Sequence, residues 1–307
     1  MVMDMDPAFL RVGGFALYWY GAVYTFGFLG TLVWLLARRA RLGLSRRDVF
    51  GLTVLVEIGV LVGGRIFDIL VYEADWYRAH PLAAFDWWQG GMASHGVLLG
   101  SLVAMAAFAY GRGRPVLVLL DEAVVPAAFL LAVGRVGNFI EGGVIGSLSD
   151  LPWAVVMPGV EGARHPVALY DGLKNLALVP VLWLALHRWP AGRGVSLWLF
   201  MMLYAGLRTL VDFFRDYEST MWGLPPGQVF NLAMAGAGLA VLVWVRLRPL
   251  PAWRPDRPAE ARAGALRVVL FCVLALYPLG IPTSWTRANI EEMRSRPTPA
   301  ETPAPGG

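Results

Sequence analysis

The stretch "VLVLLDEAVVPAAFLLAVGRVGNFIEGG", residues 116–143, decides the fold class. Residues 116–138 are mostly apolar and long enough to cross a bilayer as a helix, which takes about 20 residues. The stretch ends on Arg135, Asn138 and Glu141, polar groups that are costly to bury in hydrocarbon. A membrane helix that ends in such groups predicts a functional site at that end.

The composition of the whole chain is that of a membrane protein. Of its 307 residues, 57% are hydrophobic and 16% are charged, whereas soluble domains average about 45–50% apolar and about 25% charged residues. The 13 Trp and 10 Tyr, many of which flank apolar runs, suit the headgroup level of a bilayer. The single cysteine, Cys272, excludes an intramolecular disulfide and a multi-cysteine metal site.

Eight apolar stretches are predicted to be transmembrane helices, which makes the protein all-α and polytopic. They are residues 14–37, 50–72, 91–110, 116–138, 167–187, 195–214, 227–246 and 264–283. The connections after the first, third, fifth and seventh stretches are rich in arginine, which the positive-inside rule assigns to the cytoplasm. The N-terminus is therefore expected outside, and residues 1–12 lack the basic start of a cleaved signal peptide.

The chain is predicted to divide into a seven-span region followed by an appended segment. The predicted parts are the region 1–246, an Arg-rich cytoplasmic loop at 247–262, an extra transmembrane helix at 263–284 and a polar, Pro-rich, disordered tail at 285–307. The formal charge of +4 comes from arginines in alternate loops, which disfavours a nucleic-acid partner. No repeat of fixed period is visible, which disfavours a transporter built from repeats.

Charged and polar residues inside the spans concentrate toward the predicted outer ends. They are Arg65, Asp68, His95, Arg135, Asn138, His165, Asp171, Arg208, Asp212 and Arg215. Arg208, Asp212 and Arg215 fall at i, i+4 and i+7, so they share one helical face that must line protein or water. Arg65 with Asp68, and Arg208 with Asp212, also have a simpler interpretation as ion pairs that hold helices together.

Arginines fixed in the outer half of a bilayer suggest a phospholipid ligand. A guanidinium group keeps its charge and binds phosphate through two parallel hydrogen bonds. We therefore expect Arg135 and Arg208, with Arg65 as a third candidate, to hold a headgroup phosphate. His95 taken alone is equally well explained as a hydrogen-bonded packing residue.

The segment "GRVGNFIEGGVIG", residues 134–146, resembles the signature GRxGNFINxExxG of the bacterial prolipoprotein diacylglyceryl transferases. Further matches follow in the family's order. They are "WYG" at 19–21, "GGR" at 63–65, "GGMASHG" at 90–96, "LPWAVVMPG" at 151–159, "RHPVALYD" at 164–171 and "LRTLVDFFR" at 207–215. The signature and six further blocks in the same order identify the chain as a member of that family, or as a divergent member of it.

The resemblance implies an inner-membrane enzyme that moves the diacylglyceryl group of phosphatidylglycerol to the lipobox cysteine of preprolipoproteins. A thioether forms and glycerol phosphate leaves, without a metal or an organic cofactor. The family's important residues fall on Tyr20, His95, Arg135, Asn138, Gly146 and Arg208.

The resemblance also suggests a role for each of these residues. We expect His95 to accept the thiol proton while Arg135 and Arg208 hold the phosphate. Asn138 is expected to orient the headgroup or an arginine, and Tyr20 to hydrogen-bond a lipid oxygen. The remaining candidates for substrate binding are Gly146, Arg65, Glu141 and Asp212, of which Glu141 is interpreted as a counter-charge for an arginine.

Several positions depart from the family's pattern. Glu141 and Gly143 stand where asparagine and glutamate follow GNFI, Ala168 replaces a glutamine, and Asp171 and Asp212 replace glutamates. These changes keep two alternatives open. One is a lipid-headgroup transferase with another acceptor, and the other is a non-catalytic lipid-binding membrane protein or transporter.

Overall fold

A computed structural model of the protein is largely helical. It describes residues 2–281 apart from 4, 88–89, 143, 158–159, 190–191, 217–223, 225, 249–252 and 256–260. The longer helices are α1 (Trp19–Arg38), α2 (Arg46–Phe67), α4 (Ser94–Gly111), α5 (Val116–Ile140), α6 (Val167–Arg188), α7 (Val195–Asp212), α8 (Pro226–Leu247) and α9 (Ala265–Leu276). Each of the eight predicted stretches overlaps one of them, which confirms the all-α polytopic fold.

Not all of these helices have the length and composition of a simple span. Six of the described helices, α1 and α4 to α8, are long and apolar enough to cross a membrane. Helix α2 is long enough but carries charged side chains such as Glu57 and Arg65. Helix α9 has 12 residues and continues as the short turn η4 (Tyr277–Gly280), which is less than the about 20 residues of a full span. The predicted disordered tail, 285–307, lies outside the described residues.

The start of the first predicted helix is instead part of a β-hairpin. Strand β1 (Ala8–Val12) pairs antiparallel with β2 (Phe15–Tyr18), and α1 begins only at Trp19. Gly13, at the turn between the strands, has a φ of +60°, which two-residue hairpin turns require and glycine adopts without strain. The apolar residues 14–18 therefore extend the hairpin, and the helix prediction was wrong for them.

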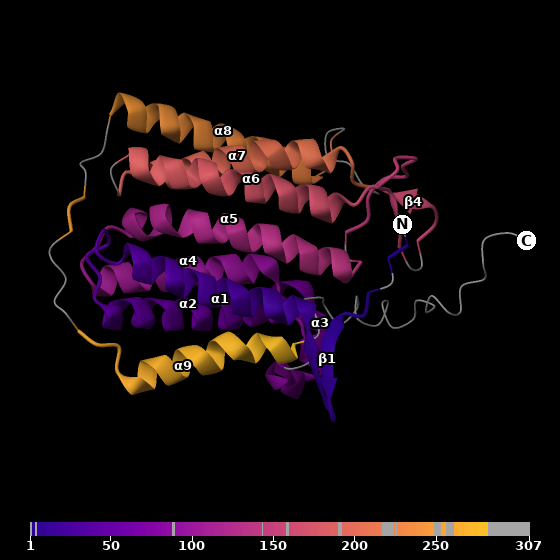
Figure 1. The fold of residues 1–307 in the computed structure, drawn as a ribbon, viewed down its shortest axis with the longest axis horizontal. Coiled ribbons are helices and arrows are strands. Elements are labelled where there is room, and N and C mark those ends of the chain that lie inside the picture. The colour runs from indigo at the N-terminus through magenta and orange to yellow at the C-terminus, as the bar shows by residue number, and fades with distance from the viewer. Residues whose placement is uncertain are drawn as a thin grey trace, which may run out of the picture.

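The connections predicted to lie outside gather at one end of the helix bundle (Figure 1). One holds the π-helix η1 (Asp68–Tyr72), α3 (Ala74–Ala79) and the turn η2 (Pro81–Phe85). Another holds β3 (Val155–Val156), which pairs antiparallel with β4 (Ala163–Arg164). The end of α5, the start of α6 and the end of α7 meet at this same end.

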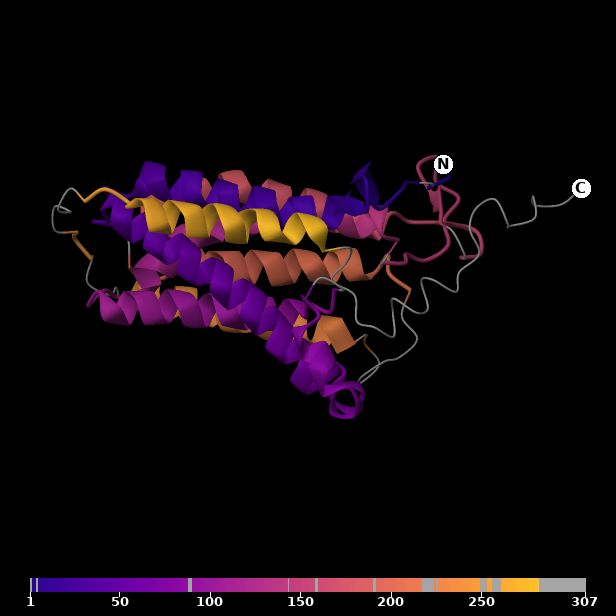
Figure 2. The same cartoon turned by 90° about the horizontal axis from the view of Figure 1, so that it is seen from below.

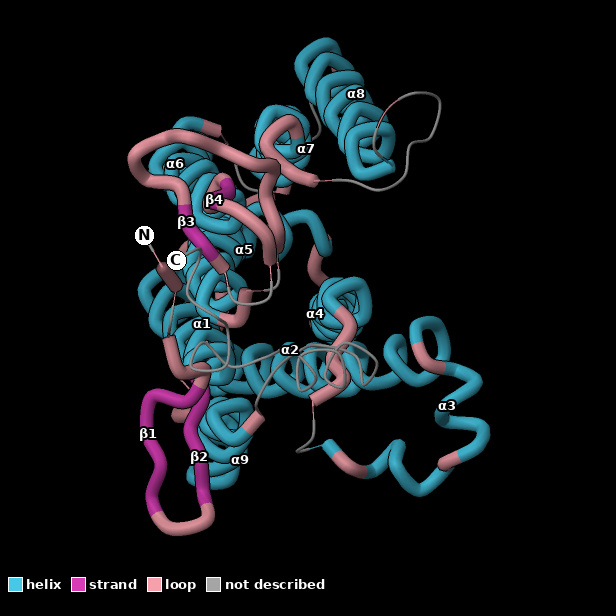
Figure 3. Tube along the Cα trace, turned by 90° about the vertical axis from the view of Figure 1, so that its right-hand side faces the viewer, coloured by secondary structure: helices cyan, strands magenta, loops and turns pink. Residues whose placement is uncertain are grey.

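Glycines allow helices α2 and α4 to approach closely. A Cβ atom on Gly100 would lie 1.9 Å from the carbonyl oxygen of Gly59, and one on Gly63 would lie 2.4 Å from that of Gly96. Such contacts between small residues are the usual way in which membrane helices pack. Helix α2 runs obliquely to the other helices and carries α3 away from the bundle (Figures 2 and 3).

The apolar core forms two main clusters along the bundle. One lies among α1, α2, α4, α5 and α9, and the other among α5, α6 and α7. Helix α9 joins the first cluster, where the hydroxyl of Thr25 donates a hydrogen bond of 2.7 Å to the carbonyl oxygen of Ala275. The rings of Phe50 and Phe271 lie 5.8 Å apart in an edge-to-face arrangement. The appended helix is therefore packed onto α1 and α2.

Candidate active site

Asp171 lies at the centre of a cluster of charged side chains. It is near the start of α6 and is 1% exposed. Its Oδ2 contacts the Nε of Arg135 from α5 and, at 2.6 Å, the Nη1 of Arg208 from α7. Its Oδ1 lies 3.1 Å from the Nζ of Lys174, one turn further along α6. One buried carboxylate thus joins three cations from three helices.

Arg208 also contacts a second carboxylate. Its Nε lies 3.1 Å from Oδ1 of Asp212, one turn later on α7. The other oxygen of Asp212 accepts a hydrogen bond of 3.1 Å from the side-chain amide of Asn231 on α8. The i, i+4 spacing noticed in the sequence is therefore a buried ion pair, and Arg208 links α7 to α6 directly and to α8 through Asp212.

Arg135 is the more accessible of the two arginines. Its side chain is 23% exposed, against 11% for Arg208. Its Nη1 donates a hydrogen bond of 3.1 Å to the Oδ1 of Asn138, one turn later on α5. Within the described part of the chain, no hydrogen bond involves its Nη2. Arg135 is thus held on two sides and keeps a nitrogen that can donate to a ligand.

Lys174 was not predicted from the sequence to belong to this site. Its side chain is 7% exposed. Its Nζ donates a hydrogen bond of 2.8 Å to the Oδ1 of Asn175 and lies 3.7 Å from the ring centroid of Tyr204 on α7. It is the only lysine in the chain, and its position inside an apolar span, one turn after Asp171, was the signal that could have revealed it.

The charges of the cluster do not cancel. Arg135, Lys174 and Arg208 are positive, whereas Asp171 and Asp212 are negative, which leaves a surplus of one positive charge among these five side chains. Charged side chains inside a membrane are costly unless they are paired or serve a function. A set with more positive than negative side chains suits an anionic ligand, and guanidinium groups match phosphate in charge and geometry.

Arg65 has a different environment. It is 2% exposed, and within the described chain its guanidinium group donates only to backbone carbonyl oxygens. The acceptors are Ala83 at 2.6 Å, Ala84 at 3.1 Å, Asp86 at 3.4 Å, Gly90 at 2.8 Å and Gly91 at 3.4 Å. These bonds match the five N–H groups that an arginine side chain has. We therefore propose that Arg65 holds residues 83–86 and 90–91 against α2 and does not bind the headgroup.

His95 lies beside α2 and not among the residues around Asp171. It is exposed at the first turn of α4. Its Nδ1 is 2.6 Å from the hydroxyl of Tyr72, and its ring stacks on Phe67 with centroids 5.8 Å apart. Within the described chain, none of its hydrogen bonds or ring contacts involves α5, α6 or α7.

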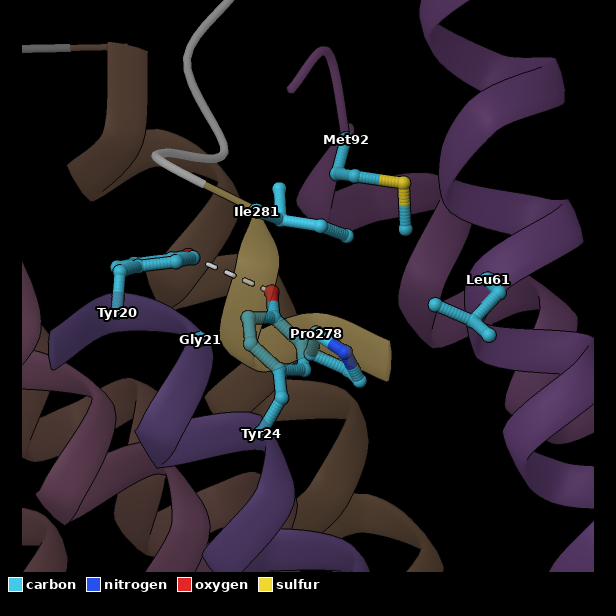
Figure 4. A pocket seen from close by; sticks show the side chains of 7 residues that line it. All are labelled: Tyr20, Gly21, Tyr24, Leu61, Met92, Pro278 and Ile281. Carbon is cyan, nitrogen blue, oxygen red and sulfur yellow. Dashed lines mark hydrogen bonds between the residues drawn. The ribbon is translucent and has the colours of Figure 1, made fainter. Parts of the chain in front are cut away.

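Tyr20 lies beside the turn of α5 that carries Arg135 and Asn138. A Cβ atom on Gly137 would lie 3.2 Å from the Tyr20 ring. The hydroxyl of Tyr20 is 3.4 Å from that of Tyr24. Both tyrosines line an apolar pocket with Gly21, Leu61, Met92, Pro278 and Ile281 (Figure 4). The last two belong to the appended segment, which therefore contributes to the wall beside Tyr20.

The glycine of the signature, Gly146, connects the loop before α6 to the end of α7. A Cβ atom there would lie 2.2 Å from the carbonyl oxygen of His165. Its own carbonyl accepts a hydrogen bond of 3.0 Å from Arg164, and its backbone pairs with Arg215. No side chain fits at this position, because the neighbouring atom belongs to the backbone.

The positions that depart from the family's pattern have distinct surroundings. Glu141 caps the C-terminal end of α5, is 8% exposed and lies close enough to Tyr24 to interact electrostatically. Ala168 is buried in an apolar cluster that includes Phe139 and Val155, where a glutamine would have to bury its amide. Gly143 lies outside the described residues.

Fold and site together define a class of protein. It is a multi-pass membrane protein in which α5, α6 and α7 hold a buried cationic site suited to an anionic group.

Comparisons with known proteins identify the family within this class. The family model described as prolipoprotein diacylglyceryl transferase matches residues 7–244. A phosphatidylglycerol--prolipoprotein diacylglyceryl transferase of Methylibium petroleiphilum is 40% identical over 260 residues, which cover 80% of this chain and 98% of that protein. Proteins of the same name from Chromohalobacter salexigens and Pseudomonas aeruginosa are 39% and 36% identical, and each match covers 80% of this chain and 95% of the relative. The chain belongs to the prolipoprotein diacylglyceryl transferase family, which confirms the resemblance. Helix α9 lies beyond the matched region.

Proposed function

We propose that this protein transfers the diacylglyceryl group of phosphatidylglycerol to the lipobox cysteine of preprolipoproteins. The names of its relatives state the same two substrates. The observation that carries the proposal is the convergence of Arg135 and Arg208, from α5 and α7, on the single carboxylate of Asp171. Two guanidinium groups beside each other in a membrane are suited to a phosphate ester.

In this proposal the two arginines hold the headgroup phosphate. Arg135 contributes its Nη2, while Asn138 and Asp171 hold its Nη1 and Nε. Arg208 is held by Asp171 and Asp212 and adds positive charge from the buried side. Donors held in place before the reaction stabilise developing negative charge better than mobile ones.

The reaction replaces a carbon–oxygen bond with a carbon–sulfur bond. The sulfur of the acceptor cysteine attacks the glyceryl carbon that carries the phosphate ester oxygen. The C–O bond breaks, the thioether forms, and glycerol phosphate leaves with the bonding electron pair. Positive charge at Arg135 and Arg208 stabilises this leaving group. The step requires no metal or organic cofactor and no cysteine of the enzyme.

A thiol is a poor nucleophile, so a base must remove its proton. We assign this role to His95, because an imidazole accepts protons near neutral pH. When its Nδ1–H donates to Tyr72, its Nε2 is left as the acceptor on an exposed ring. The acceptor cysteine would then lie between His95 and the arginines. Tyr20 would hydrogen-bond a lipid oxygen, and Glu141 would act as a counter-charge.

We also propose that the protein lies in the bacterial inner membrane with its N-terminus and its site toward the outer leaflet. The Arg-rich connections alternate along the chain with those that gather beside β1, α3 and β4 (Figure 1). The positive-inside rule would place the Arg-rich end in the cytoplasm. Arg135, Asp171 and Arg208 would then lie near the outer surface.

A transfer assay tests the proposed function. Purified protein is mixed with phosphatidylglycerol in detergent micelles and a synthetic lipobox peptide, and both products are measured by mass spectrometry. The wild-type protein is expected to yield diacylglyceryl peptide and glycerol phosphate in equal amounts. Arg135→Ala and His95→Ala are expected to yield neither, whereas Arg188→Ala, which changes an exposed arginine at the far end of α6, should behave as wild type.

Two results would contradict the proposal. If the folded wild-type protein forms neither product, the chain is not this transferase under these conditions. If it releases glycerol phosphate while the peptide stays unmodified, the function moves to a lipid-headgroup transferase with another acceptor. A peptide with serine in place of the lipobox cysteine controls for reaction at other groups.

A further inference from the structure

We propose that Lys174 is a positioning residue for the phosphate of the lipid substrate and that it acts through Asp171. This inference rests on the proposed function. It assigns a role to a buried side chain that contacts Asp171, Asn175 and Tyr204.

The first argument is the geometry of the shared carboxylate. Both arginines use the same oxygen of Asp171, Oδ2, and Lys174 holds the other oxygen, Oδ1, at 3.1 Å. A carboxylate that rotates can instead pair with one arginine through both oxygens, which is the preferred geometry for an arginine and a carboxylate. By occupying Oδ1, Lys174 opposes that rotation and keeps Oδ2 between Arg135 and Arg208.

The second argument is charge. Arg135 and Arg208 with Asp171 and Asp212 would form a neutral set, two charges of each sign. Lys174 adds a third positive charge to these side chains, which strengthens their attraction for an anion. Charge interactions between these side chains and an anion are strong because the side chains are buried and close together.

The third argument is that Lys174 itself is fixed. Its Nζ pairs with the carboxylate of Asp171, donates a hydrogen bond to Asn175 and lies 3.7 Å from the ring centroid of Tyr204. Tyr204 lies one turn before Arg208 on α7, so the cation–π contact joins Lys174 to the helix that carries the second arginine. The ammonium group is thus held on three sides and does not reach into the accessible part of the site.

The experiment compares Lys174→Met with Lys174→Arg in the transfer assay. Methionine has a similar length without the charge, and arginine keeps the charge. Lys174→Met is expected to raise KM for phosphatidylglycerol by about tenfold or more, the effect of losing roughly one interaction with a charged group. Its kcat should stay within about threefold of wild type, because Lys174 does not touch the reacting atoms. Lys174→Arg should recover most of the lost affinity.

Matched controls separate positioning from a purely structural role. Leu173→Met introduces the same side chain, without removing a charge, at the neighbouring position of α6, where the side chain is 65% exposed, and should leave KM unchanged. Thermal unfolding of each variant in detergent reports stability. Inhibition by glycerol 1-phosphate gives a binding readout that does not depend on turnover, and its inhibition constant should rise in Lys174→Met in parallel with KM.

A double substitution tests whether Lys174 acts through Asp171. If it does, Lys174→Met should add little to the loss caused by Asp171→Asn, because interacting residues are not additive. Fully additive losses would overturn the inference, as would a Lys174→Met enzyme with unchanged KM and unchanged glycerol phosphate inhibition.

Should Asp171→Asn fail to fold, the Met and Arg variants at position 174 decide the question. A wild-type protein without transferase activity would count against the proposed function, whereas an active wild type with an unaffected Lys174→Met would count against Lys174 alone.

Discussion

Arg135 and Arg208 contact the same atom, Oδ2 of Asp171, although they lie on different helices. Two like charges would otherwise repel each other, and the shared carboxylate holds them side by side. A guanidinium pair fixed in this way needs little rearrangement to receive a phosphate, which is what a site for a charged leaving group requires.

The first prediction concerns the shape of Arg208. Its guanidinium group reaches Asp171 with Nη1 and Asp212 with Nε, so it spans two carboxylates. Arg208→Lys keeps the charge but has one nitrogen, which cannot reproduce both contacts. We expect kcat/KM to fall by about 10- to 100-fold, as for the loss of a hydrogen bond between charged groups. Steady-state kinetics would measure this, with Arg188→Lys as a control, and an unchanged kcat/KM would argue against the bridging role.

The second prediction separates Arg65 from the headgroup. Arg65→Met removes the side chain's donors to the carbonyl groups of the segment 83–91, so it should lower the free energy of unfolding by about 3 kcal/mol or more. The folded fraction should bind phosphatidylglycerol with a KM within about twofold of wild type. Thermal unfolding and transfer kinetics on the same preparation check both parts. A large rise in KM at unchanged stability would instead show that Arg65 helps to hold the headgroup phosphate.

The helices could be predicted because their signal is local. A span needs a sufficient run of apolar residues, and each of the eight runs overlaps a helix. The contact between Arg208 and Asp212 followed from helical spacing, and the meeting of Arg208 with Arg135 followed from the high cost of charges that face lipid. For these residues, helical spacing and their location at the same end of the spans were enough to predict the contacts.

Other features depend on partners that only the folded chain defines. Arg65 binds carbonyl groups of a loop whose path is not encoded in any spacing near residue 65. Glu122 lies on α5 but pairs with Arg38, the last residue of α1, and with Arg41 just after that helix. Lys174 belongs to the site because α6 presents it one turn beyond Asp171. In each case the residue type was visible, whereas the choice of partner was a tertiary property.

The third prediction concerns Glu57, which lies within α2 and is 1% exposed. Within the described part of the chain, neither of its carboxyl oxygens has a hydrogen-bond partner. Burying such a group costs free energy, so Glu57→Leu should raise the free energy of unfolding by about 1–3 kcal/mol. Asp121→Leu serves as the opposite case, because Asp121 accepts hydrogen bonds from the backbone of Gly194 at 2.9 Å and Leu197 at 3.1 Å. Thermal unfolding should shift upward for the first variant and downward for the second, and a downward shift for Glu57→Leu would contradict this account.

The fourth prediction tests the docking of the appended segment beside Tyr20. A Cβ atom on Gly21 would lie 2.0 Å from the carbonyl oxygen of Pro278, and this neighbour is backbone that cannot turn away. Gly21→Ala must therefore separate α1 from η4, which should cost about 1–3 kcal/mol of stability, as overpacking does.

Gly30→Ala is the matched control on the same helix, because a Cβ atom there would meet no heavy atom within 4 Å. Alanine also favours a helix over glycine by about 1 kcal/mol, so this variant should be as stable as wild type or more so. Gly21→Ala is expected to lower both the unfolding temperature and the transfer rate, since Pro278 and Ile281 line the pocket that Tyr20 shares. If the two variants unfold at the same temperature and transfer at the same rate, the segment after α9 does not support the site, and Tyr20 is held by α1 and α5 alone.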